Sequence, residues 1–226
     1  LNGGQVNVAG SGGLMIGWNA SGFGTVSLNG GTLSARRFRG NTGVSELAFN
    51  GGTLRAAANA SPADFMTGIG TVSIQAGGAT IDTNGQDVTI AQALADGGGG
   101  GLTKIGGGVL TLSGQNTYSG ATTVTQGGLE IDTASFAGGA YSLASGTTLD
   151  VSVVNALNTQ VSAAAVTLGG LNTLGFDLGN FGNPTLAPLN VLGALTTSGD
   201  VTINLASNRP QVGQFPVIHY GSQTGT

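Results

Sequence analysis

The chain has 226 residues, of which 44 are glycine and only 7% are charged. Average proteins contain about 25% charged residues and about 7% glycine, so these glycines are expected to punctuate apolar strands. The net charge of −4 argues against a nucleic-acid partner, whose phosphates require clustered Lys and Arg, and the lack of cysteine excludes disulfides, thiolate metal sites and thiol catalysis.

Residues 1–100 repeat a short apolar strand followed by a pair of glycines. Residues 26–35 (VSLNGGTLSA) align with residues 47–56 (LAFNGGTLRA) at an offset of 21, and looser copies begin at Leu1 and Ile74. Between the glycines, aliphatic residues alternate with Thr and Ser, which is the period of a half-buried strand. Imperfect repeats of twenty-odd residues are typical of solenoids, whose loops vary while their strands do not.

Two all-β architectures fit strands that end in Asn-Gly-Gly. A sandwich of antiparallel hairpins would use Asn-Gly as a type I′ turn, whereas a parallel β-helix would use the same residues at corners where positive φ is needed. In a β-helix an aliphatic position recurs once per coil so that like residues stack, and the sequence shows this recurrence. The repeat therefore favours an all-β fold, a single-stranded parallel β-helix or solenoid, over the sandwich.

The one basic cluster lies in the N-terminal part, where Phe38 separates Arg37 from Arg39 and Arg36 precedes them. In a continuing strand, Arg37 and Arg39 share a face while Phe38 points inward. The three arginines are candidates for contact with an anionic glycan or lipid headgroup, but the favoured interpretation is that they balance acids on neighbouring coils. Trp18 is a second candidate surface contact.

Two segments interrupt the strand rhythm. Residues 58–68 include a proline and are expected to form a loop that leaves the rod between coils, where binding functions often lie. The glycine run at residues 97–101 lacks the Gly-Lys-Ser/Thr ending of a phosphate-binding loop and is expected to be a flexible corner. Between them, Asp82 and Asp87 flank the Asn84-Gly85 turn and are expected to stabilise it.

The remaining acids and the one histidine predict no catalytic or metal-binding set. Glu130 and Asp132 alternate with apolar residues, so their carboxylates should share one solvated outer face. His219 has no second His or Cys with which to hold a metal. We therefore expect no catalytic residue, no cofactor and no metal.

Residues 101–129 carry the most specific pattern in the chain, GLTKIGGGVLTLSGQNTYSGATTVTQGGL. It resembles the passenger-associated transport repeat of autotransporters (the autotransporter-associated β-strand repeat), which reads GLxKxGxGxLxLxGxNTYxGxTxVxxGxL. Each fixed position of that pattern is met. The resemblance implies a right-handed β-helix at the bacterial cell surface or outside the cell, joined to a C-terminal outer-membrane β-barrel beyond this chain. Similar repeats are thought to aid folding and export, a role that rests on analogy.

The residues of this segment also predict a local structure. Gly106, Gly108, Gly114 and Gly120 permit tight corners. The side chains of Leu110 and Leu112 should point into the coil, followed by those of Val124 and Leu129 on later faces.

Three polar residues of the segment have expected positions at its surface or corners. Asn116 is expected to bond its own turn or to stack with an Asn of a neighbouring coil. Tyr118 is expected to cover a corner with its hydroxyl in water. Lys104, the only lysine, is expected to be a solvated edge charge that discourages association between strands.

Residues 1–206 are thus expected to form β-helix coils, and residues 207–226 a last strand or the start of a further coil of a longer chain. No run approaches the ~18 apolar residues of a membrane-spanning helix. The favoured function is a non-catalytic stalk or adhesin scaffold of a cell-surface passenger, with a host or matrix glycan or protein as a possible partner. A self-associating adhesin or filament subunit and a glycan-active β-helix enzyme are the alternatives.

Overall fold

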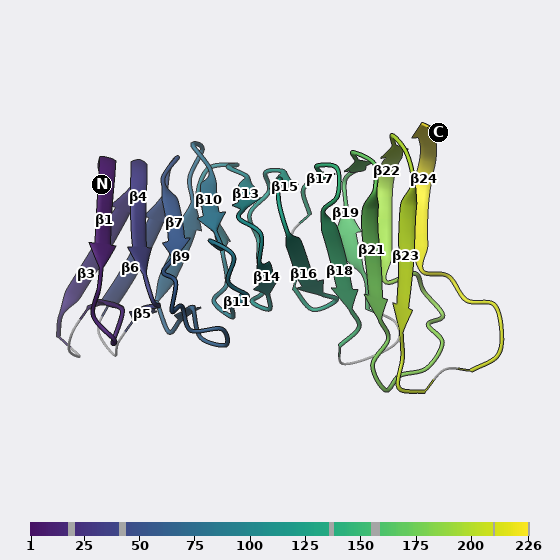
Figure 1. Ribbon diagram of the computed structural model, residues 1–226, viewed down its shortest axis with the longest axis horizontal. Helices are drawn as coiled ribbons and strands as arrows, with labels where there is room; N and C mark the ends of the chain where they lie inside the picture. Colours follow the sequence, from purple (N-terminus) through teal and green to yellow (C-terminus); the bar gives the residue numbers. More distant parts are fainter. Residues whose placement is uncertain (18–20, 41–43, 136–137, 155–158, 210, 226) are drawn as a thin grey trace.

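The chain folds as a parallel β-solenoid in a computed structural model (Figure 1) that describes residues 1–226 except 18–20, 41–43, 136–137, 155–158, 210 and 226. Every strand pair among the described residues is parallel, and successive strands of each sheet come from successive coils. The prediction of a parallel β-helix is confirmed, and the hairpin sandwich is wrong. The recurrence of apolar positions distinguished the two folds correctly, because a β-helix requires like residues to stack from coil to coil and a sandwich does not.

Three sheets form the sides of the solenoid. In chain order, sheet A contains β1 (Asn2–Val8), β4 (Gly30–Ala35), β7 (Thr53–Ala56), β10 (Ala79–Asp82), β13 (Leu102–Ile105), β15 (Thr122–Val124), β17 (Tyr141–Leu143), β19 (Val161–Ala163), β20 (Val166–Leu168), β22 (Leu189–Thr197) and β24 (Ile218–Gly225). Sheet B contains β2 (Leu14–Ile16), β5 (Phe38–Gly40), β8 (Met66–Thr67), β11 (Val88–Ile90), β14 (Val109–Leu112), β16 (Gly128–Asp132), β18 (Thr148–Ser152), β21 (Asn172–Asp177) and β23 (Val201–Ala206). Sheet C contains β3 (Phe23–Leu28), β6 (Val44–Phe49), β9 (Thr71–Ile74) and β12 (Ala95–Asp96).

The core consists of inward rows in which one residue of each coil stacks on its counterpart in the next. The row of sheet B is nearly free of solvent contact along its length and runs through Phe38, Met66, Ile90, Leu112, Ile131, Val151 and Phe176. Full burial of one such side chain is worth about 1.5–3 kcal/mol, so each coil adds a similar increment of hydrophobic stability.

The Asn-Gly-Gly corners stack as a ladder between sheets C and A. The Asn29 side-chain amide donates to Asn2 Oδ1 over 2.9 Å, and Gly77 N donates to Asn50 Oδ1 over 2.9 Å. Gly31 has φ of 70°, and a Cβ there would lie 2.5 Å from the carbonyl oxygen of Gly4. Glycine is required at this position both for its left-handed backbone and for the approach of the preceding coil.

Residues 58–68 do not leave the rod as a simple loop, so that prediction needs correction. Phe65 and Met66 are completely buried, and Met66 begins β8 of sheet B. The Phe65 ring packs edge-on against Phe38 with centroids 5.4 Å apart. The first part of the segment is also bonded to neighbouring coils, since Ser61 N–H donates to Arg36 O and Pro62 O accepts the N–H of Thr89.

Sheet C is confined to the N-terminal part, and the cross-section changes beyond β12. From there to the end, among the described residues, strands occur only in sheets A and B. Near the C-terminus β22 is long enough to pair with both β19 and β20 on one side and with β24 on the other.

Candidate functional site: the transport repeat and its buried polar residues

The segment resembling a transport repeat occupies two consecutive coils in the middle of the solenoid, from β13 to β16. Leu110, Leu112, Val124 and Leu129 are all buried at 0–1% exposure, as predicted. The strands of both coils pair in continuous register with those before and after them. The segment is therefore part of the rod and not an appendage to it.

Lys104 is completely buried, which contradicts the expectation of a solvated edge charge. It occupies the inward row of sheet A, where neighbouring coils carry Ile81 and Val124. Its ammonium donates to Gly106 O at 2.6 Å, to Gln126 O at 3.0 Å and to Thr83 Oγ1 at 3.1 Å. Lys104 therefore joins three coils at the corner between sheets A and B.

Burial makes the Lys104 ammonium easier to deprotonate. Desolvation lowers the pKa of Lys104 to about 8, and the carboxylates of Asp82 and Asp87 oppose this shift. At neutral pH the side chain is therefore protonated, and its three N–H donors are shared among four oxygen atoms, those named above and Ile105 O at 3.3 Å.

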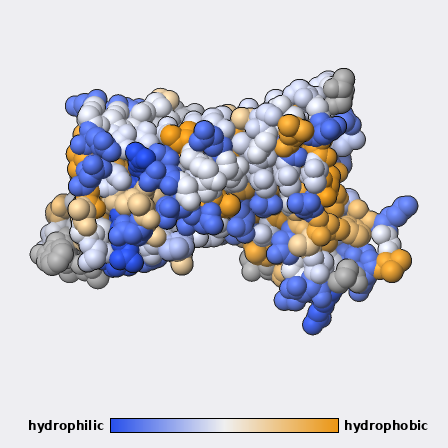
Figure 2. Space-filling view, in the orientation of Figure 1, coloured by the Kyte–Doolittle hydropathy of each residue, from blue (hydrophilic) through white to orange (hydrophobic). Residues whose placement is uncertain are grey.

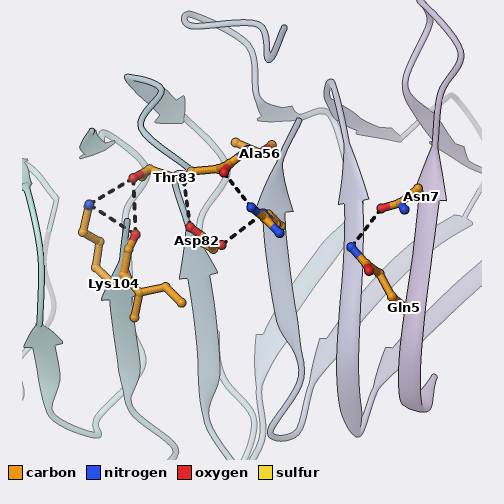
Figure 3. A network of polar contacts seen from close by, with 9 residues as sticks. Gln5, Asn7, Ala56, Asp82, Thr83 and Lys104 are labelled. Carbon is orange, nitrogen blue, oxygen red and sulfur yellow. Dashed lines mark hydrogen bonds and ion pairs between the residues drawn. The ribbon is translucent and has the colours of Figure 1, made fainter. Parts of the chain in front are cut away.

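The polar contacts at this corner continue into coils that precede the repeat (Figure 3). Arg55 Nε lies 3.2 Å from Asp82 Oδ2, and Arg55 Nη2 donates to Asn84 Oδ1 at 2.6 Å. The Asn84 side chain also donates to Ala56 O, and its backbone N–H donates to Asp82 Oδ1. Asp82 thus stabilises its turn as predicted.

Asp87 differs from that prediction. Its Oδ1 accepts the N–H of Val109, at 2.8 Å, which belongs to the next coil. Asp87 therefore links its coil to the next one, whereas Asp82 bonds within its own turn and to Arg55 of the preceding coil.

Asn116 and Tyr118 also lie inside the solenoid, where sheet C would have continued. The Oδ1 of Asn116 accepts the N–H of Leu94 and its Nδ2 donates to Ser135 Oγ, so it bonds both neighbouring coils and neither its own turn nor another Asn. Tyr118 is buried with its hydroxyl 2.8 Å from Thr122 Oγ1, so the prediction of a water-exposed hydroxyl is wrong. Burial raises the pKa of Tyr118 to about 12.

The glycines of the repeat are needed for two different reasons. Gly106 has φ of 83°, which L side chains rarely adopt. Gly108 has no such φ, but a Cβ there would lie 2.0 Å from the carbonyl oxygen of Gln86 in the preceding coil. Glycine is therefore needed at position 106 for the backbone conformation of the corner, and at position 108 for the close approach of the preceding coil.

The run at residues 97–101 is a bonded corner. Asp96 Oδ1 accepts the N–H groups of Gly98 and Gly99, and its Oδ2 accepts Ser119 Oγ over 2.5 Å. These bonds, led by that from Ser119, lower the pKa of Asp96 to about 2. The Asp96 carboxylate therefore holds the glycine run in one conformation, so the run is not the flexible corner that its composition predicts.

The basic cluster (Arg36, Arg37 and Arg39) lies at the corner between β4 and β5. Arg37 Nη1 is 2.9 Å from Asp64 Oδ2, and Phe38 points inward as predicted. All three guanidinium groups also donate to the carbonyl oxygens of Ser11 or Gly12. The three arginines are therefore brought together. Trp18, the other candidate contact, is outside the described residues.

An acidic row lies on the outer face of sheet B, farther along the rod. Glu130 stands beside Asp150 on the next strand, and Asp132 and Asp177 flank Ser152 in the adjacent register. Glu130 accepts hydrogen bonds from Thr111 Oγ1 and Ser152 Oγ.

The pKa values of two of these carboxyl groups reflect their crowding. Desolvation, with the nearby charge of Glu130, raises the pKa of Asp150. Desolvation also raises the pKa of Asp132 against hydrogen bonds from Ala134 and Ser135, and Glu130 adds to the rise.

A hollow of about 330 Å³ is associated with this acidic row and is lined by Glu130, Asp150, Ser152, Gly175, Phe176, Asp177, Asn204, Leu205 and Ala206. It is open because Gly175 has no side chain over Asp150, and a Cβ there would meet the Asp150 carboxylate. Hydrophobic surface gathers near this end of the molecule (Figure 2), where Ile203 and Leu205 are about half exposed. Sequence reasoning found Glu130 and Asp132 but missed Asp150 and Asp177, because their alignment depends on strand register.

The described residues contain neither a group of three His, Asp or Glu side chains placed to hold a metal nor a helix suited to span a membrane. His219 lies on β24 with Nδ1 2.9 Å from Asn190 Oδ1.

Comparison with known proteins identifies one segment of the chain. The family model of the passenger-associated transport repeat matches residues 102–131. No curated protein and no solved structure gives a significant match. The matched residues are those that contribute Lys104, Asn116 and Tyr118 to the interior.

Proposed function

We propose that this chain, which carries a passenger-associated transport repeat at residues 102–131, is a non-catalytic structural length of an autotransporter passenger. In this proposal it lies at the bacterial cell surface and serves as a stalk or adhesin scaffold. The observation that carries the proposal is the position of the repeat, whose strands β13 to β16 pair in parallel with the coils before and after them.

The geometry suits a spacer. Sheet A has ten strands in succession from β1 to β24, which at ~4.8 Å per strand spans roughly 43 Å. Each coil contacts only its neighbours, so length grows by addition of coils. Such a rod would hold an adhesive or other functional region away from the membrane.

Passage through a membrane before folding also suits this chain. It has no cysteine that could form disulfides in the periplasm. The buried bonds of Lys104 and Asn116 form only when consecutive coils have stacked. We propose that the chain is joined to an outer-membrane β-barrel elsewhere in its polypeptide.

Surface display tests this proposal directly. The unaltered chain would be placed between a signal sequence and the translocator of an autotransporter, and its exposure on intact cells measured by antibody binding and added protease. We expect display equal to that of an unrelated passenger on the same translocator. Retention of this chain in the periplasm, while the unrelated passenger is displayed, would contradict the proposal.

The alternative is a glycan-active enzyme, for which the hollow beside Glu130 and Asp150 is the relevant feature. Incubation with acidic and neutral polysaccharides, followed by assay for new reducing or unsaturated ends, separates the two functions. We expect no cleavage products. Products that disappear in Glu130→Gln or Asp150→Asn would establish the enzyme instead.

A further inference from the structure

The basic cluster and the acidic row lie on the same side of the solenoid. Phe38 and Ile131 belong to the single inward row of sheet B. The residues that follow them, Arg39 and Asp132, therefore point to the outer face of the same sheet, because side chains alternate along a strand. Asp177 shares the register of Asp132 through Ser152.

The two groups carry opposite net charge. Arg36, Arg37 and Arg39 face one described acid within ion-pair distance, Asp64, which leaves 3 − 1 = +2. The acidic row (Glu130, Asp132, Asp150 and Asp177) carries −4 when ionised.

Separation along the rod prevents the two groups from neutralising each other in one molecule. Strands β5 and β16, the nearest strands that carry the two groups, are four steps apart in sheet B, or roughly 19 Å at ~4.8 Å per step. That distance is more than two Debye lengths at physiological ionic strength, where the Debye length is ~8 Å. Neither group therefore has the other as an ion-pair partner in the same molecule.

We propose that this face is an interface between two copies of the chain, which associate antiparallel about a twofold axis between β11 and β14. In that arrangement the basic cluster of each copy meets the acidic row of the other. A twofold axis produces both contacts at once, since an isologous interface pairs each patch with its counterpart twice. The proposal does not depend on export or surface display.

A second copy explains the face better than a polyanion does. A sulfated or uronic-acid glycan long enough to cover the face would be attracted by the arginines but repelled by the acidic row. Another copy satisfies both patches. Between them the outward residues include Thr89 and Thr111, which are short and uncharged, while the exposed carboxylate of Asp87, two residues before Thr89, accepts the N–H of Val109.

The size of the face predicts a weak, salt-sensitive complex. From β5 to β21 there are six strand spacings, so the face is roughly 29 Å long and, with strands of a few residues, about 15 Å wide. This gives roughly 400 Å² per copy, about half of the ~800 Å² in a standard interface. Charge complementarity, and not buried area, must supply much of the specificity.

Paired charge reversals test the interface in sedimentation velocity over a range of protein concentrations. One variant is Arg36→Glu with Arg39→Glu, and the other is Glu130→Lys with Asp150→Lys. We expect the unaltered chain to dimerise at low ionic strength and to lose at least about tenfold in affinity near 0.15 M salt. Each double variant alone should be monomeric.

Mixing the two double variants is the decisive experiment. The acidic row of the first still complements the basic cluster of the second, so heterodimers should form that are weaker than the original dimer. Glu46→Lys, at an exposed residue of β6 in sheet C, changes net charge away from sheet B and should dimerise like the unaltered chain. Circular dichroism and the urea midpoint of each variant must match the unaltered chain.

Three results would overturn the interface. They are an unaltered chain that stays monomeric at every concentration, double variants that still self-associate, and a mixture that shows no heterodimer. An unaltered monomer that binds a sulfated polysaccharide through the arginines would assign the basic cluster to a glycan instead.

Discussion

The two halves of this solenoid use the same apolar core but manage charge and shape differently. Residues 1–104 contain five basic and five acidic residues, whereas residues 105–226 contain one basic and five acidic residues, so the whole net charge of 0 + (1 − 5) = −4 belongs to the second half. Both ion pairs of the described residues, Arg37–Asp64 and Arg55–Asp82, are in the first half.

Shape changes close to the same boundary. The first half has three sheets, and sheet C ends at β12. Beyond it, Asn116 and Tyr118 provide side-chain bonds where a third ladder would have been. The comparison shows that stacked aliphatic residues are enough to maintain the solenoid. The strands of its third sheet can be replaced by hydrogen bonds between buried polar side chains.

A cavity in the core should lower the free energy of unfolding more than any other change, and by a similar amount in the two halves. Leu54→Ala in β7 and Leu129→Ala in β16 each remove a side chain with 0% exposure. Each is expected to lower the free energy of unfolding by about 2–5 kcal/mol, measured by urea denaturation. A loss below ~1 kcal/mol in one half only would show that its core is not equivalent.

Removal of the buried ammonium should have the next largest effect. Lys104→Met keeps the length of the side chain but leaves the carbonyl oxygens of Gly106 and Gln126 without this donor. Each stranded buried acceptor costs about 1–3 kcal/mol, partly offset by relief of the desolvation of the charge. We expect a loss of about 2 kcal/mol at pH 7 by urea denaturation. Thr103→Met, half-buried on the same strand, is the control and should change little.

The pH dependence of that loss has a definite sign. Because the folded pKa of Lys104, about 8, is below the ordinary lysine value of 10.5, the unfolded chain binds more protons between these values. Stability should therefore rise with pH from about 8 to about 10, and the rise should be missing in Lys104→Met. Parallel curves for the two proteins would contradict the burial of a titrating amine.

Acidification should affect the two halves in opposite directions, first through the raised pKa values and at lower pH through the lowered ones. Raised pKa values at Asp132 and Asp150 mean that the folded chain binds protons first, so stability there increases as pH falls toward the unfolded value. Lowered pKa values at Asp64 and Asp96 mean that stability there is lost as pH falls through the folded values. Hydrogen exchange, corrected for intrinsic rates, should show tightening around β18 and loosening around β12. Asp150→Asn should abolish much of the tightening.

Loss of the partly exposed ion pair between Arg55 and Asp82 should have the smallest effect on the free energy of unfolding. Arg55 and Asp82 have side chains that are 39% and 17% exposed. Arg55→Ala is expected to lower the free energy of unfolding by about 0.2–1 kcal/mol, with less effect in high salt. A loss as large as that of Lys104→Met would show that the corner network acts as one cooperative unit.

The sequence alone determined the class of fold, the repeat and much of the core. Recurring aliphatic positions and paired glycines are local signals, and stacking of like residues follows directly from them. The inward positions of Leu110, Leu112 and Phe38 were therefore predictable from alternation.

Tertiary structure alone decided which polar residues lie inside and which distant charges share a face. Lys104 is a charged residue, yet it is buried because four oxygen atoms from three coils surround its nitrogen. Asp150 and Asp177 join Glu130 only through strand register, and coils of unequal length do not reveal that register in the sequence. Polar burial depends on partners supplied by other coils, and those partners exist only once the chain has wound.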